Sequence, residues 1–68
     1  MTFTVEYERE EDGRWLAEVL ELPGVLADGA NSDEAIAKAQ ALALRVLADR
    51  LEHGEGKPEF ISISFAAA

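Results

Sequence analysis

The sequence lacks cysteine altogether and contains a single histidine, His53. No disulfide can form, and a structural zinc site is not expected from one histidine without thiolates. A chain of 68 residues buries only about 60% of its unfolded surface when it folds. Small domains without disulfides or metals often gain stability by self-association, so a homodimer or a higher homo-oligomer is expected.

Long hydrophobic runs are also missing. No segment approaches the roughly 20 apolar residues that a membrane span requires. The N-terminus has no basic region followed by an apolar stretch, so we expect no signal peptide, no membrane association and a cytoplasmic protein.

Basic residues are scarce. Six Lys and Arg residues stand against 14 Asp and Glu residues, which gives a net charge of -8. An acidic surface repels phosphate backbones, so direct binding of nucleic acid is not expected. The charge is compatible with two interpretations, namely solubility alone or a basic protein partner.

What is present indicates one folded domain over residues 1–68, because 49% of the residues are hydrophobic. Residues 2–9 alternate between apolar and polar, which predicts a strand with one buried face. The sequence Glu10-Glu11-Asp12-Gly13 predicts a turn, and residues 14–20 predict a second strand that completes a hairpin.

The positions of the apolar side chains indicate the register of this hairpin. A three-residue loop with Gly13 in the left-handed conformation pairs Val5 with Val19, whereas a two-residue loop would place Glu18 on the buried face. The first register is therefore expected. It places the following side chains on the buried face: Phe3, Val5, Tyr7, Trp15, Ala17 and Val19.

The opposite face of the hairpin then carries three glutamates and two leucines. It has two interpretations: an ordinary solvated face with scattered leucines, or an acidic surface that contacts a partner. The residues on it are Glu6, Glu8, Leu16, Glu18 and Leu20.

The next segments are separated by clear turn and capping residues. Leu22-Pro23-Gly24 predicts a type II turn, and residues 25–27 predict a short third strand. Asn31 is a good N-cap for a helix over residues 32–52, with Glu34 in the capping-box position and Gly54 as the stop.

The helix is broadly apolar, and a core stripe is expected at Ile36, Ala39, Ala43, Leu47 and Leu51. One flank of it could pack deeply in a concave sheet or meet a second subunit. Residues 60–65 alternate again and predict a last strand, followed by a frayed tail at residues 66–68. The expected fold is α+β with the order β-β-β-α-β, a small mainly antiparallel sheet with one helix packed on one face.

Four stretches in this order resemble the HicB-like antitoxin family of type II toxin–antitoxin systems. They are the strand of Tyr7 leading into Glu11-Asp12-Gly13, the stretch Trp15-Leu16-Ala17-Glu18-Val19, the turn Glu21-Leu22-Pro23-Gly24-Val25, and the helix opening Gly29-Ala30-Asn31-Ser32-Asp33-Glu34-Ala35. The resemblance spans residues 5 to about 50. Many family members continue into a DNA-binding segment, and this chain is expected to be a short form without it.

The resemblance implies a partial RNase H-like fold, self-association, and a partner similar to HicA-type toxins, which are small basic ribonucleases. The function expected is an antitoxin that occludes such a toxin. The alternative is an orphan self-associating module that binds other proteins or acts as a scaffold. The partner-binding residues expected are Glu6, Glu8, Trp15, Leu16, Glu18 and Leu20, with the turn at residues 10–12 nearby.

An enzyme is the third possibility, because RNase H-like enzymes hold divalent metals with clustered carboxylates. Glu6, Glu8 and Glu18 are the acids that could cluster in this way. His53 lies near the end of the helix, where a structural role is favoured, and no nucleophile stands at motif spacing from it. We expect no catalytic residue, no metal and no cofactor.

Overall fold

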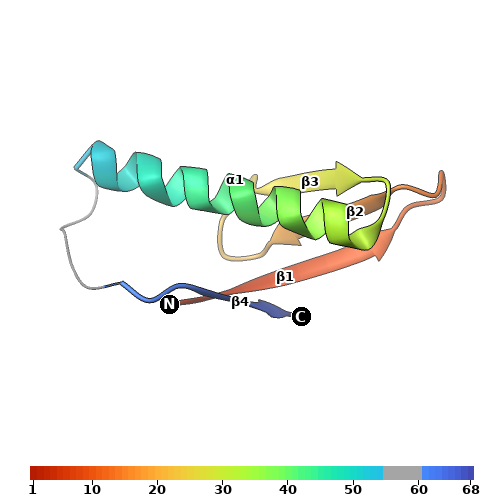
Figure 1. Ribbon diagram of the computed structural model, residues 1–68, viewed down its shortest axis with the longest axis horizontal. Coiled ribbons are helices and arrows are strands. Elements are labelled where there is room, and N and C mark those ends of the chain that lie inside the picture. Colours follow the sequence, from red (N-terminus) through yellow and green to blue (C-terminus); the bar gives the residue numbers. More distant parts are fainter. Residues whose placement is uncertain (55–60) are drawn as a thin grey trace.

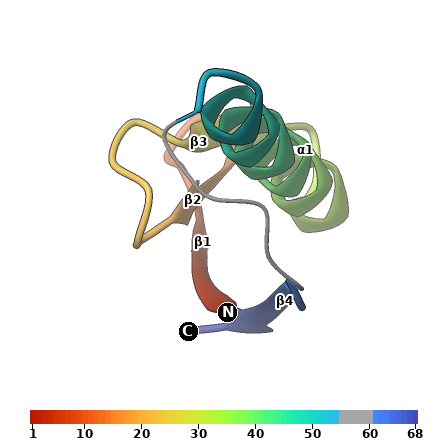
Figure 2. The ribbon, with the colours of Figure 1, turned by 90° about the vertical axis from the view of Figure 1, so that its left-hand side faces the viewer.

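The computed structural model describes residues 1–54 and 61–68 (Figure 1). Its elements follow the order expected from the sequence. They are β1 (Thr2–Arg9), β2 (Trp15–Val19), β3 (Leu26–Gly29), α1 (Ser32–Glu52) and β4 (Ser64–Ala67). The α+β class and the packing of one helix on one face of a single sheet are therefore confirmed (Figure 2).

The sheet is mixed and has the strand order β3-β2-β1-β4. β1 pairs antiparallel with β2, β2 pairs antiparallel with β3, and β1 pairs parallel with β4. α1 packs chiefly on β2 and β3, and β4 lies at the edge of the sheet that is farther from the helix (Figure 2). No helix in the described residues is long and apolar enough to cross a membrane.

The register expected for the hairpin of β1 and β2 is confirmed. Val5 lies opposite Val19 and Arg9 lies opposite Trp15. The amide of Glu10 donates to the carbonyl of Arg14 at 2.7 Å, so three residues form the loop. Gly13 has a φ of 89°, in the left-handed region that glycine enters without steric cost.

The turn after β2 also has the expected form. Val25 donates its amide to the carbonyl of Leu22 at 3.0 Å, and Gly24 has a φ of 87°. A positive φ at this third position defines a type II turn. The third strand lies later than expected, at Leu26–Gly29, because Trp15 pairs with Gly29 and so extends the ladder through Asp28.

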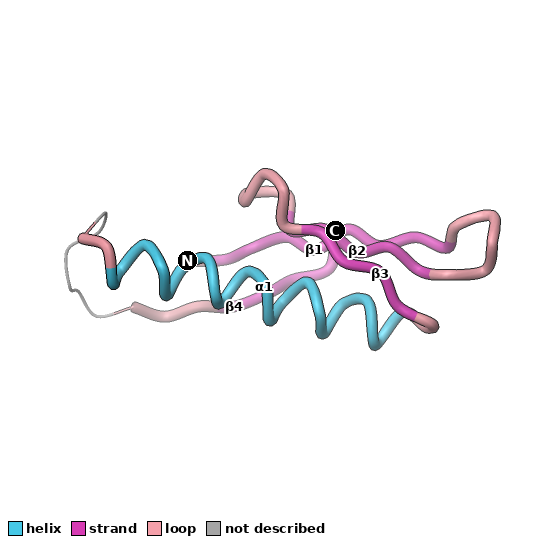
Figure 3. Tube along the Cα trace, turned by 90° about the horizontal axis from the view of Figure 1, so that it is seen from above, coloured by secondary structure: helices cyan, strands magenta, loops and turns pink. Residues whose placement is uncertain are grey.

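The bounds expected for α1 are correct. The side chain of Asn31 accepts from the amide of Glu34 at 2.8 Å and caps the first turn, as N-cap residues do. Gly54 follows the helix with a φ of 71°. The helix lies along the sheet, and its N-terminus follows directly from the end of β3 (Figure 3).

The buried line of α1 differs from the expected stripe. Ala35, Ala39 and Ala43 are fully buried, whereas Leu51 is 46% exposed. Alanines let the helix axis approach β2 and β3 closely, and the C-terminal half of α1 extends past the ends of these two strands (Figure 1). Leu51, near the C-terminal end of α1, therefore does not pack on β2 or β3. The buried core residues are Phe3, Val5, Ala17, Val19, Leu22, Val25, Ala35, Ala39 and Ala43.

The last strand is also displaced from the expectation. It occupies Ser64–Ala67 and not residues 60–65, of which residue 60 lies outside the described residues. Phe65 pairs with Phe3 and Ala67 pairs with Val5, while the amide of Ala68 donates to the carbonyl of Val5 at 2.9 Å. The expectation of a frayed tail at residues 66–68 was wrong, because β1 supplies a free edge to which these alanines bind by backbone hydrogen bonds.

Candidate protein-binding face

One face of the sheet is left uncovered by α1, and it carries the side chains that alternate with the core. Thr4 and Glu6 follow this alternation on β1, as does Glu18 on β2, which pairs with Leu26 of β3. We call this surface the acidic face. Its residues are Glu6, Glu8, Leu16, Glu18, Leu20, Leu26 and Asp28.

Three glutamates meet at the centre of the acidic face. Glu6 lies directly opposite Glu18, and Glu8 lies directly opposite Leu16. Together with Tyr7 these four residues line a shallow hollow between β1 and β2. Like charges that face each other across two strands destabilise a sheet. The fold therefore carries an electrostatic cost at this place that its own packing does not require.

Leucines surround the glutamates. Leu20 is 45% exposed and Leu26 is 48% exposed, and the half-buried Leu16 lies on the same face, on the other side of Glu18 along β2 from Leu20. Leu20 follows the end of β2 and is held there because its amide donates to the carbonyl of Thr4 at 3.0 Å. The acidic face thus combines negative charge with apolar side chains that water does not favour.

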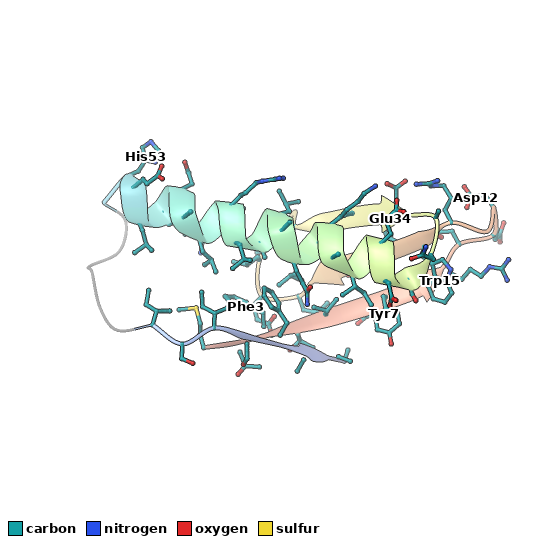
Figure 4. All side chains as sticks on the ribbon, viewed as in Figure 1. Phe3, Tyr7, Asp12, Trp15, Glu34 and His53 are labelled. Carbon is teal, nitrogen blue, oxygen red and sulfur yellow. The ribbon has the colours of Figure 1, made fainter. Side chains whose placement is uncertain are left out.

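Trp15 does not belong to this group, although the sequence interpretation included it. It lies opposite Arg9, on the face of the sheet that α1 covers, and packs against the core. Its ring lies beside that of Tyr7, with centroids 6.4 Å apart and planes tilted by 43° (Figure 4). The structure therefore brings together Glu6, Glu8, Leu16 and Glu18, places Leu20 beside them, and separates Trp15 from them.

Glu21 is a structural residue at the border of the acidic face that sequence reasoning missed. Its carboxylate accepts from the amide of Thr4 and from the hydroxyl of Thr4, both at 2.7 Å. These hydrogen bonds from Thr4, first that of the amide and then that of the hydroxyl, hold the pKa of Glu21 below its usual value. No local sequence motif indicates this contact, because Thr4 is 17 residues away from Glu21 in the chain.

Leu26 and Asp28 were also not predicted to lie on this face. The register between β2 and β3 would have placed them there. Once Glu18 is paired with Leu26, Leu16 must pair with Asp28. Asp28 is partly neutralised by Arg14, whose Nε lies 3.2 Å from its carboxylate. The charge that remains free on the acidic face is therefore concentrated on β1 and β2.

The turn at residues 10–12 adds acids at the far tip of the hairpin (Figure 4). Asp12 is engaged locally, since its carboxylate accepts from the amide of Arg14 at 2.9 Å. Glu10 and Glu11 are exposed. The turn extends the acidic surface beyond the sheet.

The carboxylates do not gather into a metal site in the part of the chain that the structure describes, where no group of three or more His, Asp or Glu side chains has a suitable arrangement. His53 lies at the opposite end of the molecule from the hairpin turn (Figure 4). Its Nδ1 lies 3.1 Å from the carboxylate of Asp49 and 2.8 Å from the carbonyl of the same residue, which is a helix-terminal contact.

Comparisons with known proteins add no relative to this description. No protein-family model, no curated protein and no solved structure matches the chain.

Proposed function

We propose that this chain is an antitoxin-like protein that uses the acidic face to bind and occlude a small basic ribonuclease of the HicA type. The observation that carries the proposal is the gathering of Glu6, Glu8 and Glu18 around Leu16 on the face that α1 leaves open. The resemblance of the turn and cap motifs to HicB-like antitoxins supports the choice of partner.

The chemistry of the acidic face suits a basic protein. A ribonuclease must present positive charge to the phosphates of RNA, so a surface of glutamates attracts the same region. The glutamates would accelerate the encounter and orient the two proteins, and the leucines would contribute the apolar area that gives the complex its lifetime. Inhibition by occlusion requires no catalytic residue on this chain, and both proteins would meet in the cytoplasm.

The electrostatic repulsion between Glu6 and Glu18 is a second argument for a basic partner. Glu6 and Glu18 face each other in the free domain and repel, whereas a lysine or arginine from a partner placed between them would remove the repulsion. Residues that destabilise the free fold are common at sites that bind something else.

The experiment that tests this function is a paired capture from a lysate of the organism that makes the chain. Tagged wild-type protein and the double variant Glu6→Lys plus Glu18→Lys are incubated at low salt and then washed at high salt. The control is Asp49→Lys plus Glu52→Lys, which changes the net charge equally on the far end of α1. There the new lysines suit the negative end of the helix.

The expected result is one small basic protein that is held by the wild type and the control, lost from the Glu6 and Glu18 variant, and released by salt. The recovered protein should cleave RNA, and the wild-type chain should stop this cleavage. Equal capture by all three proteins would show that the acidic face is not the binding surface. Recovery of the bait alone would favour the orphan self-associating module.

A further inference from the structure

A second surface of the molecule has the opposite character. Between α1 and the inner side of β1 and β4 lies an open hollow, because α1 covers β2 and β3 more closely than the other half of the sheet. We call it the open groove. It is lined by Val5, Tyr7, Ile36, Gln40, Phe65, Ala66 and Ala67.

The open groove continues along the molecule as two facing apolar rows. On α1, Leu44 lies one helical turn beyond Gln40, and it is 46% exposed. Beside β4, Ile63 alternates with Phe65 and is 38% exposed. α1 runs antiparallel to β4 (Figure 1), so the two rows extend in step away from the hollow.

Among the described residues, most of the exposed large hydrophobic side chains lie in this groove or on the two rows that continue it. Leu20 and Leu26 lie instead on the acidic face. Six of these side chains lie in the groove or continue it, as the alternation along the strands and the spacing along the helix indicate. They are Met1, Tyr7, Leu44, Leu51, Ile61 and Ile63. Soluble domains rarely leave such a contiguous apolar surface without an interaction partner.

The distribution of charge indicates what that partner is. Of the 14 acidic residues, ten lie between Glu6 and Glu34, whereas the second half of α1 carries Arg45 and Arg50 against Asp49 and Glu52. No side chain that lines the described groove is charged. Two copies of a chain with a net charge of -8 repel each other least where they meet through such a neutral surface.

We propose that the open groove is the interface through which two copies of this chain form a two-fold symmetric dimer. A two-fold interface must be complementary to itself. The groove meets this requirement, since it offers a hollow beside Phe65 and projecting side chains such as Leu44 on one surface. The dimer leaves both acidic faces free, because they lie on the other side of the sheet. The proposal does not depend on the identity of any basic partner.

The test is the mass of the purified chain in solution, measured by sedimentation equilibrium from about 10 µM to about 1 mM, a range that separates specific dimers from weak encounters. The variant is Leu44→Lys and the matched control is Leu26→Lys, since the two leucines are 46% and 48% exposed. The wild type and the control are expected to be dimers with closely similar dissociation constants. Leu44→Lys should raise the dissociation constant about a hundredfold or more, because a two-fold interface contains the substitution twice.

A second readout uses salt. Added sodium chloride screens the repulsion between two acidic chains and should strengthen the dimer, whereas it weakens an acidic–basic complex. Circular dichroism of each variant confirms that it remains folded. A wild type that is monomeric up to about 1 mM would overturn the proposal. So would a dimer that folded Leu44→Lys leaves intact, or one that Leu26→Lys dissociates.

Discussion

At the scale of single residues, Glu21 holds the end of the hairpin ladder with its side chain. Just beyond the last pair of the ladder, Leu20 donates its amide to the carbonyl of Thr4. The amide of Thr4 in turn donates to the carboxylate of Glu21. The Thr4 hydroxyl donates to the second oxygen of the same carboxylate. A side chain thereby anchors the turn that follows β2 to the first strand.

This contact makes a prediction about pH. The pKa of Glu21 is lowered in the folded protein by the hydrogen bonds from Thr4, so its contribution to stability is complete above the unfolded pKa and disappears as the pH falls through the lower folded pKa. We expect the free energy of unfolding of the wild type to lose this contribution between about pH 5 and pH 3. Glu21→Gln should lack that part of the pH dependence.

Urea denaturation at several pH values measures the difference between the two proteins. Glu34 has its pKa lowered chiefly by the hydrogen bond and charge of Lys38, and it titrates with the same sign in both proteins. It therefore cancels in the comparison. Parallel stability curves for the wild type and Glu21→Gln over this range would contradict the role assigned to Glu21.

The glutamate pair gives a prediction of the opposite kind. Since Glu6 faces Glu18 across the hairpin, the single substitution Glu18→Lys replaces a repulsion with an attraction. It should increase the free energy of unfolding by about 0.5 kcal/mol, while it weakens the capture of a basic partner. Chemical denaturation at low salt measures the gain, and about 1 M salt should abolish it by screening. A loss of stability at low salt would show that the two carboxylates do not repel in the fold.

At the scale of elements, the helix and the third strand approach each other very closely. A Cβ atom placed on Gly29 would lie 2.6 Å from the backbone nitrogen of Ala35 and 3.0 Å from the side chain of Glu34. Gly29 is buried at the end of β3. The start of α1 can therefore sit against β3 only because residue 29 has no side chain.

We expect Gly29→Ala to destabilise the domain by about 1–3 kcal/mol, the usual cost of overpacking a site that is closed by backbone. Ala30→Gly is a matched control, since Ala30 is exposed in the same connection. Thermal unfolding followed by circular dichroism compares the two variants. An unchanged melting temperature for Gly29→Ala would mean that the junction of β3 and α1 is looser than the structure shows.

The elements also show what sequence patterns determine and what they do not. The hairpin register followed from one comparison, since the alternative placed Glu18 in the core, and the helix bounds followed from Asn31 and Gly54 because these signals are local. The last strand did not follow. Its position depends on the free edge of β1, and the alanines that bind there have no strand preference of their own.

The buried side of α1 was predicted only in part for a related reason. A helical stripe that ends in Leu51 is correct as a pattern, but only an arrangement in three dimensions reveals that β2 and β3 stop short of it. Likewise alternation predicted five residues of the acidic face, whereas the role of Glu21 could not be predicted. The five are Glu6, Glu8, Leu16, Glu18 and Leu20. Contacts between distant segments carry no periodic signal.

At the scale of the whole molecule, the two sides of the sheet differ in chemical character. The acidic face carries the charge that suits a basic protein, and the open groove on the other side is neutral and apolar. A dimer formed through the groove would present two acidic faces to two partners. Binding of the basic partner and self-association should then be independent of each other. Leu44→Lys should therefore leave the affinity of one acidic face for a basic protein unchanged.

The measurement that tests the central claim most directly is titration calorimetry with the basic protein recovered in the capture experiment. The wild-type chain, the Glu6 and Glu18 double-lysine variant, and the Asp49 and Glu52 double-lysine control are compared at low and physiological salt. We expect tight, salt-sensitive binding by the wild type and the control, and a dissociation constant at least about a hundredfold higher for the Glu6 and Glu18 variant. Equal affinity of all three folded proteins would contradict the claim that the acidic face is the binding surface.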